Sequence, residues 1–421
     1  MDYKSRGIGI LLLCTLVLMP AYTPAANAIE SCWTRSPLTG WATLRPPEGV
    51  RVTTFAVFPG PNPQVLVGAV SELSNPSNPT PTAGVWLSDA GGCEWKQILA
   101  LPSITARGDM VQQVEVLFTG TNWRVFATIA DKGPSMPTFR YTDDLGANWN
   151  TVAFDEMAVG LRSAWSNFFV APSNPSVAYL IASAGQSNLD LAPLLISTED
   201  GGTSWRYQEI PAATTPRVLP FVGVAATNPK ELVVITVFDP GHERPTQNQK
   251  ILRSLDAGSS WETIKPPQPP NQMTGAALYS TTVSSASRQF VVWSDTFGLS
   301  SSQDGGASWQ SLNVVPGQAL FGTGGRYIFT ILNPEGRSQD IKEKDLVLRH
   351  DLSRGLVTNL KSSSISDEEV DGSYHFDAKL ILGSGLYMLG GCGESESSAR
   401  SGGCSALLRF IGAGTTVPRK V

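Results

Sequence analysis

The sequence predicts an all-β protein built as a ring of four-stranded antiparallel sheets, a β-propeller, and two observations lead to this fold class. First, an eight-residue sequence motif that ends in tryptophan, which we call the phrase, occurs five times. Its tryptophans follow one another at intervals of 54, 56, 56 and 48 residues. Repeats of about this length are typical of propellers and solenoids. Second, each phrase lies between short apolar runs, so the repeat unit consists of strands. The copies are SDAGGCEW (88–95), TDDLGANW (142–149), TEDGGTSW (198–205), SLDAGSSW (254–261) and SQDGGASW (302–309).

The first 28 residues are expected to be a targeting segment. Lys4 and Arg6 precede an apolar stretch at 8–19, and Ala-Asn-Ala at 26–28 provides a cleavage site. This is the layout of a secretory signal peptide, and the apolar stretch is short for a membrane span. We expect cleavage after Ala28 and one propeller domain over 29–421, secreted or periplasmic. An uncleaved N-terminal anchor is the alternative. The chain has no Asn-x-Ser/Thr acceptor site, which favours a bacterial source.

Each repeat unit is predicted to contain four strands. Asn-Pro pairs begin at Asn62, Asn174 and Asn228, which lie 31–33 residues before the tryptophan of the next phrase. Proline fixes φ and pushes the preceding residue toward extended geometry, so the pair separates two strands. The unit is therefore strand A, Asn-Pro turn, strand B, variable loop, strand C, phrase hairpin and strand D.

The two ends of the repeat array are irregular. Residues 346–360 keep an aspartate and a glycine of the phrase but lack its tryptophan, and 406–417 contains one secure strand. The segment GWATL at 40–44 matches the strand that follows each phrase, yet no strand C precedes it. We expect this N-terminal strand to become the outer strand of the last unit. That pairing closes a ring of seven blades of about 56 residues and removes two exposed sheet edges. Six and eight blades are the alternatives.

Four cysteines remain after removal of residues 1–28, and an even number in an exported protein suggests disulfides. Cys32 precedes the closing strand and Cys93 lies in the first phrase, so a Cys32–Cys93 bond is expected at the ring closure. Cys392 and Cys404 bracket a polar loop and are expected to form the second bond. Zinc is the competing ligand, but the chain has no Cys-x-x-Cys pair and only three histidines.

Three positions of the last four phrases have expected structural roles. The third-position aspartate can accept backbone N–H bonds across the hairpin, the fifth-position glycine can adopt positive φ, and the tryptophan can pack between sheets. Glycan binding by the tryptophans is the alternative. In the first phrase, Ala90 takes the third position and Asp89 lies one place earlier. The residues concerned are Asp144, Gly146, Trp149, Asp200, Gly202, Trp205, Asp256, Gly258, Trp261, Asp304, Gly306 and Trp309.

The phrase resembles the Asp-box, or bacterial neuraminidase repeat, and the resemblance covers essentially the whole of 29–421. Propellers with this repeat include sialidases, xyloglucan-degrading glucanases, sortilin-type receptors and a photosystem II assembly factor; no specific member is matched. The resemblance to sialidases implies an Arg-Ile-Pro motif followed by an acid/base aspartate. Here Leu44-Arg45-Pro46-Pro47 lacks the isoleucine, and no aspartate occurs between Arg45 and Asp89. The resemblance therefore implies the fold more than an activity.

Composition narrows the classes of partner. The net charge is −5, and only 16% of the residues are charged, so the basic excess typical of nucleic-acid or anionic-membrane binding is missing. No phosphate-binding loop, nucleophile elbow or metal signature occurs. We expect no cofactor, no metal, no nucleic-acid partner and, after cleavage, no membrane span.

The variable loops, opposite the boxes, form the expected functional face because the repeats diverge there. Its chemically richest residues are Asp239, His242 and Glu243 in one loop and Asp295 in the next unit's loop. They could act as general acids and bases, or Asp239 and Asp295 as a carboxylate pair, and solvated turns are the alternative. We expect a monomeric, non-catalytic binding or assembly module for a protein or a cell-envelope component. The alternative is a sialidase-like hydrolase or lyase acting on glycans through these carboxylates.

Overall fold

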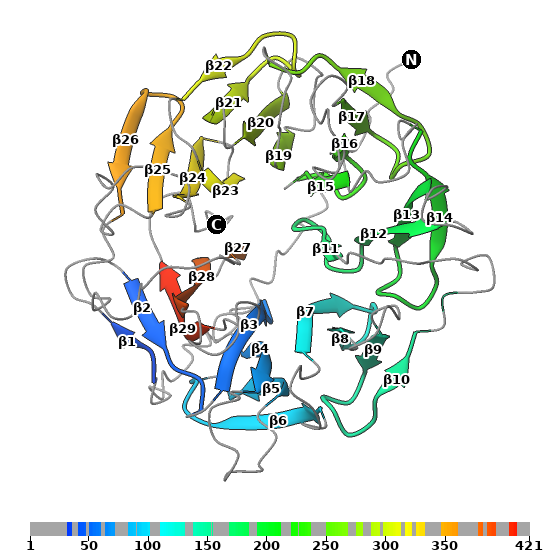
Figure 1. The fold of residues 1–421 in the computed structure, drawn as a ribbon, viewed down its shortest axis with the longest axis vertical. Helices are drawn as coiled ribbons and strands as arrows, with labels where there is room; N and C mark the ends of the chain where they lie inside the picture. The colour runs from blue at the N-terminus through cyan, green and yellow to red at the C-terminus, as the bar shows by residue number, and fades with distance from the viewer. Residues whose placement is uncertain are drawn as a thin grey trace, which may run out of the picture.

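The fold consists of antiparallel sheets arranged around a centre (Figure 1). The computed structural model describes residues 32–35, 41–47, 50–59, 64–71, 83–89, 91–101, 110–130, 138–152, 154, 168–184, 192–211, 220–225, 227–236, 250–267, 275–280, 288–294, 298–312, 316–321, 326–332, 347–360, 378–381, 385–392 and 404–410. Every regular element among these residues is a β-strand, so the predicted all-β class is confirmed.

Five sheets each contain four strands whose order in space is their order in the chain, joined by antiparallel pairing. They are β7 (Met110–Phe118), β8 (Trp123–Ala130), β9 (Thr138–Thr142) and β10 (Asn150–Thr151); β11 (Phe168–Val170), β12 (Ala178–Ala184), β13 (Ala192–Thr198) and β14 (Arg206–Glu209); β15 (Pro220–Val224), β16 (Leu232–Thr236), β17 (Ile251–Ser254) and β18 (Glu262–Ile264); β19 (Gly275–Ser280), β20 (Arg288–Ser294), β21 (Gly298–Ser302) and β22 (Gln310–Ser311); and β23 (Pro316–Phe321), β24 (Tyr327–Leu332), β25 (Val347–Asp351) and β26 (Leu356–Asn359).

The sixth sheet has nine strands and joins the two ends of the chain. Its N-terminal strand β2 pairs antiparallel with the C-terminal strand β29, from Trp41 opposite Phe410 to Leu44 opposite Leu407, as the sequence predicts for the closing strand. One residue pair, Cys404 with Val52, joins β29 to β3. The strands are β1 (Thr34–Arg35), β2 (Trp41–Leu44), β3 (Val50–Val57), β4 (Val65–Ser71), β5 (Gly84–Ser88), β6 (Trp95–Ala100), β27 (Ala378–Ile381), β28 (Gly385–Cys392) and β29 (Cys404–Phe410).

In Figure 1 the first strand of each unit lies nearest the centre, and the last strand lies at the outside of the ring. The inner strands are β3, β7, β11, β15, β19, β23 and β27. The outer strands include β6, β10, β14, β18, β22 and β26, with β2 outside β29.

The hydrophobic core lies between neighbouring sheets. In β16, Leu232 and Val234 pack in the cluster with Tyr179 of the preceding sheet, whereas Val233 and Ile235 pack with Val292 of the following sheet. Successive side chains of a strand point to opposite faces, so a strand with a sheet on each side is apolar at every position. This explains the continuous apolar runs before each variable loop.

Candidate functional site

The strand order gives the ring two different edges. In each four-stranded unit, the turn between the first two strands and the hairpin between the last two lie at one edge, which we call the box edge. The connections between the second and third strands, and those that lead to the next unit, leave the opposite edge, which we call the loop edge. This division follows from antiparallel pairing alone.

At the box edge, each hairpin is held by a carboxylate and a hydroxyl of its own sequence. The Ser254 hydroxyl donates to Asp256 Oδ1 at 2.8 Å and accepts the N–H of Gly258 at 2.7 Å. Asp256 Oδ1 also accepts the N–H of Ser260 at 2.8 Å, and its Oδ2 accepts the Ser260 hydroxyl at 2.6 Å. Both carboxylate oxygens are therefore used inside the hairpin.

The other three hairpins repeat this arrangement. The first-position hydroxyl donates to the aspartate at 2.7–2.8 Å, and the aspartate accepts the N–H four residues later at 2.8–2.9 Å. The hydroxyl is a contribution that our sequence interpretation missed, although a Ser or Thr at the first position of all five phrases signals it. The triads are Thr142–Asp144–Asn148, Thr198–Asp200–Ser204 and Ser302–Asp304–Ser308.

These hydrogen bonds stabilise the ionised carboxylates. The side-chain bond from Ser308, with the Ser308 N–H, lowers the pKa of Asp304 to about 2, and the Asn148 N–H lowers the pKa of Asp144 to about 2. The Ser260 hydroxyl likewise lowers the pKa of Asp256. For Asp200, burial raises the pKa, but bonds from Ser204 and Thr198 outweigh it and the pKa is lowered. The box carboxylates remain ionised at neutral pH.

Each hairpin also packs against the preceding sheet. Gly146 (φ 93°) and Gly306 (φ 90°) both have positive φ. A Cβ built on Gly146 would lie 2.5 Å from Ile98 Cβ, and one on Gly306 would lie 2.2 Å from Ile264 Cγ2. The indole N–H of Trp149 donates to the Ile98 carbonyl at 2.7 Å. Glycine is thus required both by its backbone conformation and by the close approach of the neighbouring outer strand.

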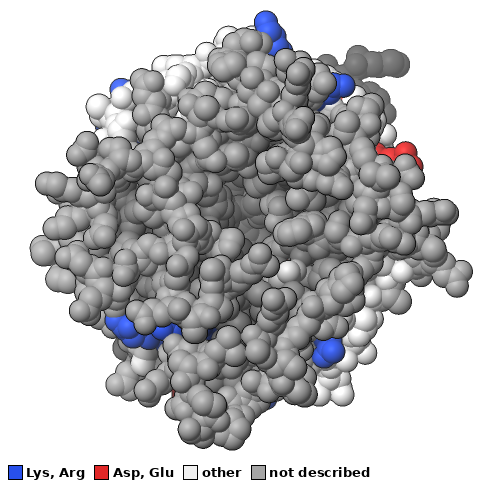
Figure 2. Space-filling model, in the orientation of Figure 1, with Lys and Arg blue, Asp and Glu red and all other residues white. Residues whose placement is uncertain are grey.

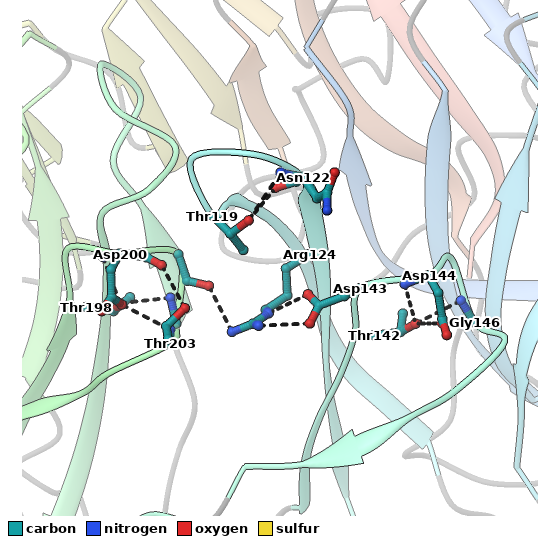
Figure 3. A network of polar contacts seen from close by, with 12 residues as sticks. Thr119, Asn122, Arg124, Thr142, Asp143, Asp144, Gly146, Thr198, Asp200 and Thr203 are labelled. Atoms are coloured by element: carbon teal, nitrogen blue, oxygen red, sulfur yellow. Dashed lines mark hydrogen bonds and ion pairs between the residues drawn. The ribbon is translucent and has the colours of Figure 1, made fainter.

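A buried arginine links two hairpins at the box edge (Figure 3). Arg124 of β8 binds both carboxylate oxygens of Asp143 at 2.7 and 2.9 Å, and its third nitrogen reaches the carbonyl of Gly201, in the hairpin of the next sheet, at 3.4 Å. The Tyr141 ring lies 4.4 Å from the guanidinium carbon. The bond to Asp143 raises the pKa of Arg124, against the effect of burial.

The first hairpin achieves the same result with a displaced aspartate. Asp89 Oδ1 accepts the N–H groups of Cys93 and Glu94 at 2.7 and 3.2 Å. A Cβ on Gly92 would lie 2.6 Å from Leu44 Cδ1 of β2, so this hairpin packs on the N-terminal strand as the others pack on the preceding sheet. The structure contains the expected Cys32–Cys93 disulfide beside it. Cys392 and Cys404 stand opposite each other in the β28–β29 ladder.

The candidate chemical residues lie outside the described residues. Asp239, His242 and Glu243 belong to the connection between β16 and β17, and Asp295 belongs to the connection between β20 and β21. The two connections belong to consecutive sheets, β15–β18 and β19–β22, and both are at the loop edge. Because their residues are not described, the expected carboxylate pair stays a prediction.

Near the loop edge, polar side chains join inner strands of neighbouring sheets. Gln113 of β7 donates its amide N–H to the Phe168 carbonyl at 2.6 Å and accepts the Phe168 N–H at 2.8 Å, as a neighbouring strand would. The Thr53 hydroxyl lies within hydrogen-bond distance of the carbonyl of Val111. Thr53 is the extra residue of a β-bulge in β3, and Gln113 directly follows the bulge of β7. Sequence periodicity does not reveal such bulges, so our sequence interpretation missed these residues.

Charged residues do not gather in the described part of the face seen in Figure 2; they occupy separate places toward its periphery. Among the residues that the structure describes, no three His, Cys, Asp or Glu side chains come together as metal ligands would. Within the same residues, no helix is long and apolar enough to cross a membrane.

The comparisons with known proteins agree on the fold. No protein-family model and no curated protein matches the sequence. A solved structure of YCF48 bound to D1 peptide superposes with a TM-score of 0.52 at 11% identity, over 93% of this chain and 99% of that one. The chain is a β-propeller. An ancestral GH74 enzyme superposes with a TM-score of 0.53 at 14% identity, over 90% of this propeller and 50% of the enzyme, so this chain spans about half of its length. These identities show the fold and no specific family.

Proposed function

We propose that this propeller is an exported, non-catalytic binding or assembly module that recognises a protein or a cell-envelope component through its loop edge. The protein acts as a monomer, after removal of residues 1–28 as a signal peptide. The basic residues and apolar stretch of that segment support export, and so does the Cys32–Cys93 disulfide, since structural disulfides persist in oxidising compartments.

One observation carries the proposal: the two edges use their polar groups differently. At the box edge, the carboxylates and hydroxyls of four hairpins bond within the hairpin, and the glycines pack against the neighbouring sheet. At the loop edge, connections of unrelated sequence and length leave a scaffold held by inter-sheet packing. Variable loops on a rigid scaffold are the usual arrangement for recognition.

We also propose that the ring has seven blades, with the nine-stranded sheet counted as two. The strands β3–β6 form one blade, and β27, β28, β29 and β2 form the other. The single residue pair between Cys404 and Val52 supports this division. Leu44 of β2 also supports this division, because it packs against Gly92 in the same way as Ile264 of β18 packs against Gly306.

The correspondence with YCF48 supports a peptide or protein as the ligand. It extends over nearly all of both chains, and that propeller was solved with a peptide bound. The alternative is a glycan-active hydrolase or lyase, favoured by the similarity to the ancestral GH74 enzyme. In that case Asp239 and Asp295, with His242 and Glu243, would supply the carboxylates and the proton-transfer groups.

The proposal is tested with the mature protein, residues 29–421, as bait in a native envelope and culture-medium extract, with retained material identified by mass spectrometry. One dominant protein retained equally by wild type and by an Asp239→Ala, Asp295→Ala variant supports the binding module. Retained polysaccharide without a protein, together with cleavage products that the double variant no longer releases, would establish the enzyme instead.

A further inference from the structure

The N-terminal strand occupies an unusual place in the ring. The other outer strands, β6, β10, β14, β18, β22 and β26, directly follow the third strand of their own unit in the chain, whereas β2 comes from the opposite end of the chain and pairs with β29. We call the segments Cys32–Arg35 and Trp41–Leu44 the N-terminal strap. Its strands β1 and β2 pair antiparallel with each other, but no hairpin connects β2 to β29, the strand on which it closes the ring.

The strap is held by buried side chains and by a few strand pairs. Leu44 is 1% exposed and Trp33 is 9% exposed, and both belong to one cluster with Phe55 and Val65 of the neighbouring strands. The guanidinium carbon of Arg409 lies 5.9 Å from the centre of the Trp33 ring. The four residue pairs between β2 and β29 equal those between β26 and β25, but no hairpin connects β2 to β29, so the strap depends on a further constraint.

That constraint is the Cys32–Cys93 disulfide, whose two residues are 61 positions apart in the sequence. It ties the strap to the first box hairpin, where the Cys32 N–H also donates to the Gly91 carbonyl at 3.1 Å. The bond thus anchors the strap at the β5–β6 hairpin, since no hairpin connects the strap to β29. Constraining a loop of this length reduces the freedom of the undocked chain substantially.

The bond lies at the surface, although the side chains that it secures are buried. Cys32 and Cys93 are both exposed, while Gly92 is buried against Leu44. An exposed disulfide is accessible to an attacking thiolate. Reduction can therefore occur while the ring is still closed.

From these observations we infer that the Cys32–Cys93 disulfide is a reduction-sensitive closure of the ring. A dithiol reductant, R(SH)₂, transfers two electrons and two protons by thiol–disulfide exchange: its own disulfide forms, the Cys32–Cys93 bond breaks, and two thiols result. The strap then detaches from β29 more often. Each detachment exposes the backbone of β29 at Leu407–Phe410, which otherwise pairs with β2. It also weakens the sheet whose strands β28 and β29 carry the connection between Cys392 and Cys404 at the loop edge. This regulation goes beyond the proposed binding function.

Hydrogen exchange measured by mass spectrometry tests the inference on the chain from residue 29. A Cys392→Ser, Cys404→Ser background leaves Cys32–Cys93 as the bond to be reduced, and dithiothreitol is the probe. After reduction, verified by the mass of the alkylated peptides, amides of 41–44 and 404–410 should exchange about tenfold faster or more. Peptides covering Leu232–Thr236, in another sheet, should exchange as before.

A Cys32→Ser, Cys93→Ser variant with Cys392 and Cys404 intact provides the matched control, and it should show the fast exchange without any reductant. Unchanged exchange of 41–44 and 404–410 in the reduced protein would overturn the inference. Acceleration that is equal at Leu232–Thr236 would also overturn it, because the bond would then support the whole fold rather than its closure.

Discussion

In each regular box hairpin, a hydroxyl and a carboxylate make the hydrogen bonds, and a glycine provides positive φ. The fourth position adopts positive φ in all four regular boxes: it is Gly201 (70°) and Gly305 (74°) in two of them, but Leu145 (53°) and Ala257 (60°) in the others. Residues with a Cβ are strained there. The chain tolerates this strain at the fourth position but has glycine at every fifth position, where space is also lacking.

Two glycines with positive φ separate the cost of backbone strain from the cost of overlap. Gly306→Ala should lower the free energy of unfolding by about 2–4 kcal/mol, because the new methyl group would overlap Ile264. Gly355→Ala should cost only about 1 kcal/mol, since φ is 64° but no atom lies within 4 Å. Denaturant unfolding of both variants measures the difference. Equal losses would contradict the role of packing between sheets.

The lowered carboxyl pKa values predict acid sensitivity. Because the pKa of Asp304 is about 2 in the folded protein, below its ordinary 3.8, its contribution to stability is complete above about pH 5 and is lost as pH falls through 2. Asp304→Asn should therefore lower the melting temperature most at pH 6, and the melting temperatures of wild type and variant should converge toward pH 2. Glu209→Gln, an exposed charge at the end of β14, controls for the general loss of one negative charge. A gap that widens at low pH would refute this account.

At the scale of elements, the β28–β29 hairpin carries a prediction about its cross-link. Cys392 and Cys404 are cross-strand partners, a placement that suits disulfide geometry. A peptide map of the non-reduced protein should join Cys392 to Cys404 and Cys32 to Cys93. A fragment joining Cys32 to Cys392, or free thiols at both C-terminal positions, would show that the pairing is wrong.

The sequence predicted the elements well where the repeat is regular. The five phrases placed the hairpins, and the match of 40–44 to the strands after them predicted the pairing of β2 with β29. The sequence could not predict the bulge at Thr53 or the bulge just before Gln113, because a bulge changes register without changing composition. The candidate site was harder still, since loops that diverge between repeats carry no periodic signal from which geometry can be derived.

At the scale of the whole molecule, the ring closes by the same contacts that join its sheets. The contact of Gly92 with Leu44 lies where the two ends of the chain meet. It is equivalent to the contact of Gly146 with Ile98 between two consecutive sheets. In the closed ring, the polar groups of the box edge bond within their own hairpins, whereas the loop edge carries the variable connections. We infer that the hairpins of the box edge serve stability and the connections of the loop edge serve recognition.

Partner capture with two sets of variants tests this division between the two edges. One set replaces each loop-edge connection in turn, such as 237–249, with a short Gly-Ser turn, and the other carries box changes such as Asp256→Ala. Asp256→Ala should lower the melting temperature by a few degrees and still capture the wild-type partner below that temperature. At least one loop variant should melt as wild type and lose the partner. Loss of the partner with the folded box variants, and its retention by every loop variant, would contradict the claim.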